Sequence, residues 1–215
     1  PAWIPVSSGF PAPCWEFYGP DALEEIHATH PILFPNYRRG SIWPDHLPIT
    51  AYTIAGKPYT DPWGCVWETQ VTGMVGSVRT HPLASWDAFE GFHAPDPETS
   101  DGLLPLDWRR LAEWAAGARA GGHLVTFWLA HGHTFLRLQD LRGFENLVFD
   151  MADDEPRLPA LIRMVEDFNA ALVERYLGFE PDMVGIPEDL GSQTGPLVSP
   201  AFFRKFIKPS YLRLT

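Results

Sequence analysis

The 215-residue sequence is poor in cysteine, in basic residues and in long apolar runs, and each shortage excludes a class of protein. Cys14 and Cys65 are far apart and form no CxxC pattern, which favours buried thiols in a reducing, cytoplasmic setting. The 16 Lys and Arg against 27 Asp and Glu give a formal charge of −11, which argues against a nucleic-acid partner. No apolar run approaches the about 20 residues of a membrane span, and the sequence shows no signal peptide, so we expect no membrane partner.

Several catalytic signatures are also missing. The sequence has no GxGxxG, no Walker A loop, no GxSxG elbow and no HExxH, so dinucleotide, nucleotide and serine-hydrolase functions lose their usual support. What it has in abundance is proline, tryptophan and phenylalanine, with 22, 9 and 14 residues. That composition favours long ordered loops anchored by buried rings.

The chain reads as one domain, residues 1–215, and as a piece of a longer protein. It begins at Pro1 in an apolar run and ends at Thr215 inside an amphipathic pattern without a Gly, Asn or Pro stop signal. We therefore expect part of the domain to lie C-terminal to residue 215.

The pattern of elements predicts an α/β fold. Residues 66–78 read as a β-hairpin that turns at Thr72-Gly73. After a helix capped by Asp107, the apolar run His123–Leu129 predicts a strand that is buried on both faces. Apolar residues three and four apart predict a helix over 155–178, and residues 183–187 form the next strand. Helices and strands in alternation give a parallel sheet, open or closed into a barrel.

The strongest candidate site follows that last strand. Glu188 and Asp189 stand at its C-terminal tip, where α/β proteins bind ligands and carry out chemistry. A carboxylate there can transfer a proton or position a substrate, so both acids are candidate catalytic residues. The structural alternative is that one of them caps backbone N–H groups of the loop. Gln193 follows as a candidate ligand-orienting amide, with loop bracing as its alternative.

A second group of candidates precedes the hairpin. Trp63 offers a flat apolar face beside Asp61, which suits a planar or sugar-like ligand. Its structural alternative is an anchor for the hairpin. Glu68, next to Trp67, is an equally open candidate for substrate binding.

Basic residues supply the remaining candidates. His131 and His133 alternate after the strand over 123–129, so both imidazoles can face one metal ion, although no third ligand is evident and polar loop histidines are commoner. Arg137 and Arg142 can each bind a ligand carboxylate through the planar guanidinium. The alternative is an ion pair with Asp140, Glu145 or Asp150.

Three blocks of the sequence together resemble the uroporphyrinogen decarboxylase family, which includes decarboxylases of haem synthesis and cobalamin-related methyltransferases. The first block is Asp61–Glu68, the second is Leu141–Leu147 with Asp150, and the third is 187–209. The third carries an acidic pair, a Gly-x-Gln loop, a Ser-Pro helix start and a Lys-Pro pair. These are Glu188-Asp189, Gly191-Ser192-Gln193, Val198-Ser199-Pro200 and Lys208-Pro209.

The resemblance implies a (β/α)8 barrel with its site at the C-terminal mouth, incomplete in this chain. It also implies a methyltransferase-like enzyme that acts with a corrinoid-linked methyl group, a corrinoid protein as partner, a small-molecule substrate and a homodimer as one assembly to consider. Zinc, which makes a bound thiolate a competent methyl acceptor in such methyltransferases, is expected to be held by ligands C-terminal to this chain.

Other functions stay open. The decarboxylases carry an Arg-rich motif near the N-terminus that residues 36–40 (NYRRG) do not reproduce, which favours the methyltransferases over uroporphyrinogen III decarboxylase. Abundant tryptophan and strand-tip acids leave a glycoside hydrolase as an alternative, which needs a second carboxylate about 5–10 Å from the first. A non-catalytic module that binds a tetrapyrrole or corrinoid is the remaining one.

Overall fold

The computed structural model describes residues 8–35, 37–40 and 49–215, which form two compact units. The first unit comprises residues 1–59 and 66–79, and the second comprises residues 60–65 and 80–215. None of the helices in the described ranges is both long enough and apolar enough to cross a membrane.

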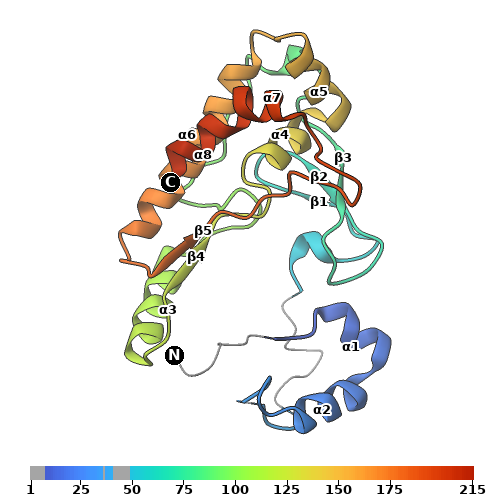
Figure 1. Cartoon of the computed structure of the whole chain (residues 1–215), viewed down its shortest axis with the longest axis vertical. Coiled ribbons are helices and arrows are strands. Elements are labelled where there is room, and N and C mark those ends of the chain that lie inside the picture. Colours follow the sequence, from blue (N-terminus) through green and yellow to red (C-terminus); the bar gives the residue numbers. More distant parts are fainter. Residues whose placement is uncertain (1–7, 36, 41–48) are drawn as a thin grey trace. The chain divides into compact units, whose positions relative to one another are not determined.

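The first unit contains two helices and most of a small sheet (Figure 1). Its elements are α1 (Ala12–Tyr18), α2 (Pro20–Thr29), a 3-10 turn (Ala51–Thr53) and the strands β1 (Tyr59–Thr60), β2 (Val66–Glu68) and β3 (Ser77–Thr80). The sheet order is β1-β2-β3. The segment predicted as a hairpin thus contains two neighbouring strands, and Gly73 between them has a φ of 85°, which glycine adopts without a steric cost.

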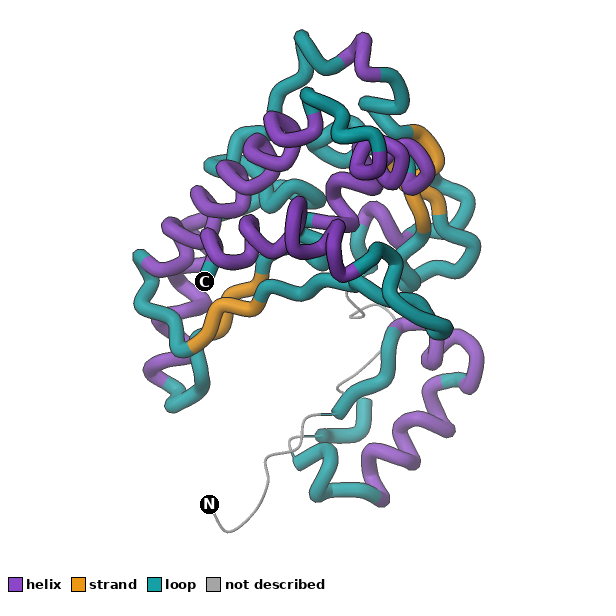
Figure 2. The backbone as a smooth tube through the Cα atoms, turned by 45° about the horizontal axis from the view of Figure 1, so that its top comes forward, coloured by secondary structure: helices purple, strands orange, loops and turns teal. Residues whose placement is uncertain are grey.

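The second unit carries the regular helix and strand pattern. Its helices are α3 (Trp108–Ala120), α4 (Phe135–Arg142), α5 (Phe144–Ala152), α6 (Leu158–Leu177), α7 (Pro200–Phe202) and α8 (Lys208–Leu214), with a 3-10 turn at Trp86–Ala88 and a π-helical turn at Phe203–Ile207. Its strands are β4 (Thr126–Trp128) and β5 (Met183–Gly185). These two strands pair in parallel, with Phe127 opposite Val184 (Figure 2). Whether a closed barrel forms stays a prediction.

Two predicted helix starts are confirmed. Asp107 caps α3, because its carboxylate accepts a hydrogen bond from the backbone N–H of Arg110 at 3.0 Å. Ser199 caps α7 in the same way through the N–H of Phe202 at 3.2 Å. In both cases a side-chain oxygen satisfies one of the donors that a helix start leaves without an intrahelical partner.

The apolar face predicted for the long helix is also confirmed. α6 begins at Leu158 and ends at Leu177, close to the expected bounds, and packs against α4 and α8. Every apolar position that the spacing selected is buried. These are Leu158, Leu161, Ile162, Val165, Phe168, Leu172 and Tyr176. Burial of this one face supplies most of the helix's stabilisation, since isolated helices are marginal in water.

The prediction that the strand over 123–129 is buried on both faces is wrong for the described residues. Val125, Phe127 and Leu129 are buried, whereas Leu124 and Trp128 are 70% and 55% exposed. One face packs on aromatic rings, with Phe127 stacked on Tyr176 at 4.8 Å. The apolar run alone could not reveal that the other face is only partly covered by the described residues.

Candidate active site at the ends of β4 and β5

The carboxyl ends of β4 and β5 bring together two parts of the sequence that are more than fifty residues apart. Beyond the strands the parallel pairing continues, because Leu129 N–H donates to Gly185 O and Gly132 N–H donates to Pro187 O, both at 3.0 Å. The histidines that follow β4 therefore lie beside the acids that follow β5. The two pairs differ sharply in burial.

Glu188 is buried and caps α4. Its Oε2 accepts hydrogen bonds from the backbone N–H groups of Thr134 at 2.9 Å and Phe135 at 2.7 Å, and its Oε1 accepts one from Leu136 at 3.1 Å. The side chain of Thr134, at the N-cap position, makes no capping bond, so Glu188 supplies the negative charge that a helix N-terminus favours. Both carboxylate oxygens of Glu188 thus accept backbone hydrogen bonds. This outcome agrees with the structural alternative, in which one of the two acids caps backbone N–H groups.

His133 and Tyr211 enclose this carboxylate. The His133 ring is fully buried, with Nδ1 at 3.7 Å from Glu188 Oε2 and 3.2 Å from Pro187 O, and it stacks on Tyr211 at 5.3 Å. Tyr211 donates its hydroxyl to Glu188 at 3.3 Å. Burial, followed by the charge of Glu188, raises the pKa of Tyr211, so the phenol keeps its proton. The other ring nitrogen of His133, Nε2, is buried and has no hydrogen-bond partner among the described residues.

Asp189 and His131 form the exposed counterpart, which we call the strand-end pair. Asp189 Oδ1 lies 3.5 Å from His131 Nε2, with the side chains 65% and 58% exposed. The separation is that of an ion pair and is longer than a normal hydrogen bond, and both side chains are open to a substrate. The sequence named each residue as a candidate but did not pair them.

Gln193 is exposed in a compact loop beyond this pair. The loop is closed by an isolated bridge between Gly191 and Pro196 and by the Ser192 N–H, which donates to Gly195 O at 2.7 Å. Since the bracing is supplied by Ser192, the amide of Gln193 is available to a ligand, and its orienting role stays a prediction.

Arg137 is buried on α4 and forms an ion pair with Asp61 at 2.7 Å. Asp61 also accepts from Cys65 N–H at 2.9 Å, and Arg137 donates to Gly102 O at 3.3 Å. The sequence suggested Asp140, Glu145 or Asp150 as the partner, but Asp61 is seventy-six residues away and could not be read from local spacing. We use the name α4 cluster for Asp61, Arg137, Asp140 and Glu188.

Trp63 lies behind this ion pair rather than on an open surface. It is 2% exposed, contacts the Phe168 ring at 5.1 Å, and lies 5.8 Å from the Arg137 guanidinium. The side chain therefore packs in the core of the second unit. Burial, followed by the charge of Asp61, raises the pKa of the nearby Cys65 thiol, which keeps it from acting as a thiolate.

Asp140 is the member of the α4 cluster whose chemistry sequence reasoning missed. Burial raises its pKa to about 7, opposed by the charge of Arg137 and reinforced by the charges of Asp61 and Glu188. The available signal was its position one helical turn after Arg137, which suggested only an ion pair. For Arg142, the predicted ion pair with Asp150 is confirmed at 2.8 Å.

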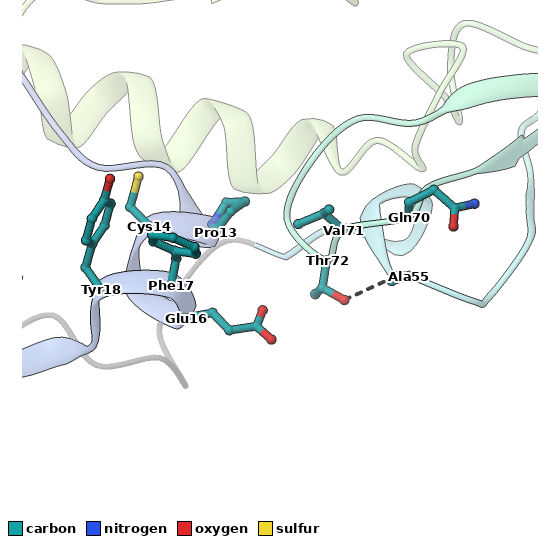
Figure 3. A pocket seen from close by; sticks show the side chains of 9 residues that line it. All are labelled: Pro13, Cys14, Glu16, Phe17, Tyr18, Ala55, Gln70, Val71 and Thr72. Carbon is teal, nitrogen blue, oxygen red and sulfur yellow. Dashed lines mark hydrogen bonds between the residues drawn. The ribbon is translucent and has the colours of Figure 1, made fainter.

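Glu68 lies in the first unit, exposed at the end of β2, where it lines a small cavity of about 200 Å³ with Lys57 and Gln70. A larger cavity of about 730 Å³ in the same unit is lined by Cys14, Tyr18 and Thr72, among others (Figure 3). In Figure 3 the Thr72 hydroxyl accepts a hydrogen bond from the Ala55 N–H. A substrate-binding role for Glu68 stays a prediction.

The described residues do not fit a zinc site. Within the described ranges no three His, Cys, Asp or Glu side chains are placed to hold one metal ion. His131 faces Asp189 in solvent, while His133 is buried against Glu188 and Tyr211. A structural zinc site needs about four ligands and a catalytic one needs three.

Comparison with known proteins supports the fold. No family model and no curated protein matches the sequence. A methyltransferase from Methanosarcina mazei matches the structure with a TM-score of 0.57 at 16% sequence identity. The match covers 98% of this chain and 61% of the methyltransferase, so the chain spans less than two thirds of its neighbour's length. At this identity the likeness concerns the fold.

Proposed function

We propose that this protein is a methyltransferase of the uroporphyrinogen decarboxylase superfamily and that the strand-end pair takes part in its reaction. One observation carries the proposal: His131 and Asp189 lie side by side and exposed at the carboxyl ends of adjacent parallel strands. The fold shared with a methyltransferase supports the choice of reaction. Active sites of α/β folds lie at this end of the strands.

The reaction we propose moves a methyl group from a methylated corrinoid, presented by a corrinoid protein, to the sulfur of a small thiol. The thiol loses its proton, and its sulfur electron pair forms the new S–C bond. The electron pair of the broken bond stays with the corrinoid. Since His131 Nε2 faces Asp189, Nδ1 is left to accept the thiol's proton, and Asp189 stabilises the imidazolium that results. No step is assigned to zinc, because the described residues do not form its site.

The roles of the other candidates follow from their positions. Gln193 is exposed in the loop beyond Asp189 and is assigned to orient the acceptor. Glu188 is assigned to position the backbone after β4, because its carboxylate accepts three hydrogen bonds from backbone N–H groups at the N-terminus of α4. Asp61 and Arg137 neutralise each other, so neither is assigned to substrate.

Methyl transfer to a thiol is the direct test. The purified protein, supplied with methylcobalamin, zinc and a thiol, should consume the methylcorrinoid, which is followed by its absorbance. His131→Ala and Asp189→Asn should lower the rate by about 10²-fold or more, the usual contribution of a positioned base. His123→Ala and Asp153→Asn are the matched controls, since both side chains are exposed and lie outside the strand-end pair. Retention of activity in His131→Ala rejects the site, and no transfer by the unmodified protein rejects the reaction.

Decarboxylation of a tetrapyrrole is the less favoured reaction. Its substrate carries many carboxylates and needs converging cations. Arg137 and Arg142, the cations that sequence reasoning offered, are buried in ion pairs with Asp61 and Asp150. A glycoside hydrolase loses support in a similar way, because both oxygens of Glu188 accept backbone hydrogen bonds. Release of CO2 from uroporphyrinogen would favour decarboxylation over methyl transfer.

A further inference from the structure

A second cavity of the second unit lies along β4, and none of its lining residues belongs to the strand-end pair or the α4 cluster. Its volume is about 540 Å³, within the range of about 300–1,000 Å³ that small-molecule sites occupy. We call it the β4 pocket. The side chains that matter for its chemistry are Asp101, Asp107, Arg110, Trp114, Trp128 and Tyr176.

Aromatic rings form the walls of the β4 pocket. Trp114 and Trp128 are 44% and 55% exposed, so their faces are open to a ligand. Trp114 is held edge-on to Phe127 at 5.5 Å, and Phe127 is stacked on Tyr176. Trp128 lies across β5, since a Cβ on Gly185 would come within 2.0 Å of its ring. The two indoles are therefore fixed by packing, which lowers the entropic cost of binding a ligand.

A carboxylate with an unused oxygen also lines the β4 pocket. Asp101 accepts backbone hydrogen bonds from Leu103 at 2.8 Å and Leu104 at 2.6 Å, and both end on Oδ1. Oδ2 is left without such a bond among the described residues. Burial raises the pKa of Asp101, and the backbone hydrogen bonds of Leu104 and Leu103 and the charge of Arg137 oppose this rise.

The other polar groups keep the β4 pocket negative. Asp107 caps α3 and Arg110 is exposed on the same helix, so the lining carries two carboxylates and one guanidinium. Burial, followed by the charge of Asp101, raises the pKa of Tyr176 to about 12, so its phenol stays neutral. A cation is favoured here both by the net charge and by the negative faces of the aromatic rings.

We propose that the β4 pocket binds a small organic ammonium cation, with Asp101 as its counter-ion and Trp114 and Trp128 as the walls that contact its alkyl groups. Carboxylates and indole faces together recognise alkylammonium groups, whereas a neutral ligand of the same shape gains only the apolar contact. The proposal is independent of the methyl-transfer reaction, because it concerns other residues.

Binding of choline and of its neutral carbon isostere, dimethylbutanol, tests the proposal. Calorimetric titration of the purified protein should give choline a dissociation constant on the order of 1 mM and an affinity about tenfold or more above that of the isostere. Asp101→Asn keeps an acceptor for the turn and removes the charge, so it should lower choline affinity about tenfold while leaving the isostere unchanged. Asp153→Asn is the control.

Indole N–H signals in NMR spectra locate the ligand. Choline should shift the signals of Trp114 and Trp128, assigned through Trp114→Phe and Trp128→Phe, and leave that of Trp108 in place. The proposal is overturned by equal affinity for the isostere, by unchanged choline affinity in Asp101→Asn, or by shifts confined to other tryptophans. Absence of binding by the unmodified protein up to about 50 mM choline also overturns it.

Discussion

The α4 cluster and the strand-end pair lie at the same end of the same two strands, yet their side chains are used in opposite ways. Glu188 and Asp189 are neighbours in sequence, and one is 4% exposed while the other is 65% exposed. The buried Glu188 accepts hydrogen bonds from three backbone N–H groups, and the exposed Asp189 faces His131. At a strand tip, therefore, the type of residue does not separate a structural acid from a chemical one. Burial and partners do.

The largest expected change in stability comes from the buried ion pair of the α4 cluster. Arg137→Met removes the buried cation that faces the Asp61 carboxylate, and we expect it to lower the free energy of unfolding by about 3–5 kcal/mol. Arg109→Met, which removes an exposed pair with Glu113, should cost less than about 1 kcal/mol. Urea denaturation measures both. If the Arg137→Met, Asp61→Leu double variant is no more stable than Arg137→Met, loss of the cation beside Asp61 is not the cause.

Replacing Asp140, in contrast to replacing Arg137, is expected to stabilise the protein. Its pKa of about 7 in the folded protein exceeds the about 3.9 of an unfolded aspartate, so folding favours the protonated form. Its contribution to stability is full below pH about 4 and is lost as the pH rises to about 7. Asp140→Asn should therefore raise the free energy of unfolding at pH 8, by about 2 kcal/mol after allowance for partial exposure, and have little effect at pH 4. A pH-independent difference in urea midpoints would contradict this.

The two neighbouring acids give the smallest and sharpest contrast. Glu188→Ala leaves three backbone donors of α4 without their acceptor, which should cost about 1–2 kcal/mol of stability. Glu188→Gln retains part of this bonding and should cost less. Asp189→Ala should change stability by no more than about 0.5 kcal/mol, since the side chain is exposed. Equal losses at both positions in thermal or urea unfolding would remove the distinction.

Local pattern was sufficient for several elements of the second unit. The apolar residues of α6 follow a helical period, and the period alone identified the face that is buried. Asp107 and Ser199 were recognisable as helix caps because capping involves residues only three positions away. The strand over 123–129 was located, but its exposed face was not foreseen, because exposure depends on which distant segments cover it.

The site could be predicted only as a set of residue types. Glu188, Asp189, His131, His133, Asp61 and Arg137 were all named from the sequence. Their pairing into His131 with Asp189, His133 with Glu188 and Arg137 with Asp61 was not foreseen. Each of these pairs joins segments more than fifty residues apart. Without the register of β4 against β5, no spacing rule selects the two pairs of a histidine and an acid.

The sequence by itself determined the helices α3 and α6 and the positions of strands β4 and β5, because hydrophobic period and capping act over a few residues. It also placed acids at the tip of β5. Only the tertiary structure decided which acid keeps its charge available, because that depends on desolvation and on hydrogen-bond donors from α4. The same packing hides Trp63 and leaves Trp114 and Trp128 open beside Asp101. Side chains of one chemical type thus take different roles according to what the fold brings against them.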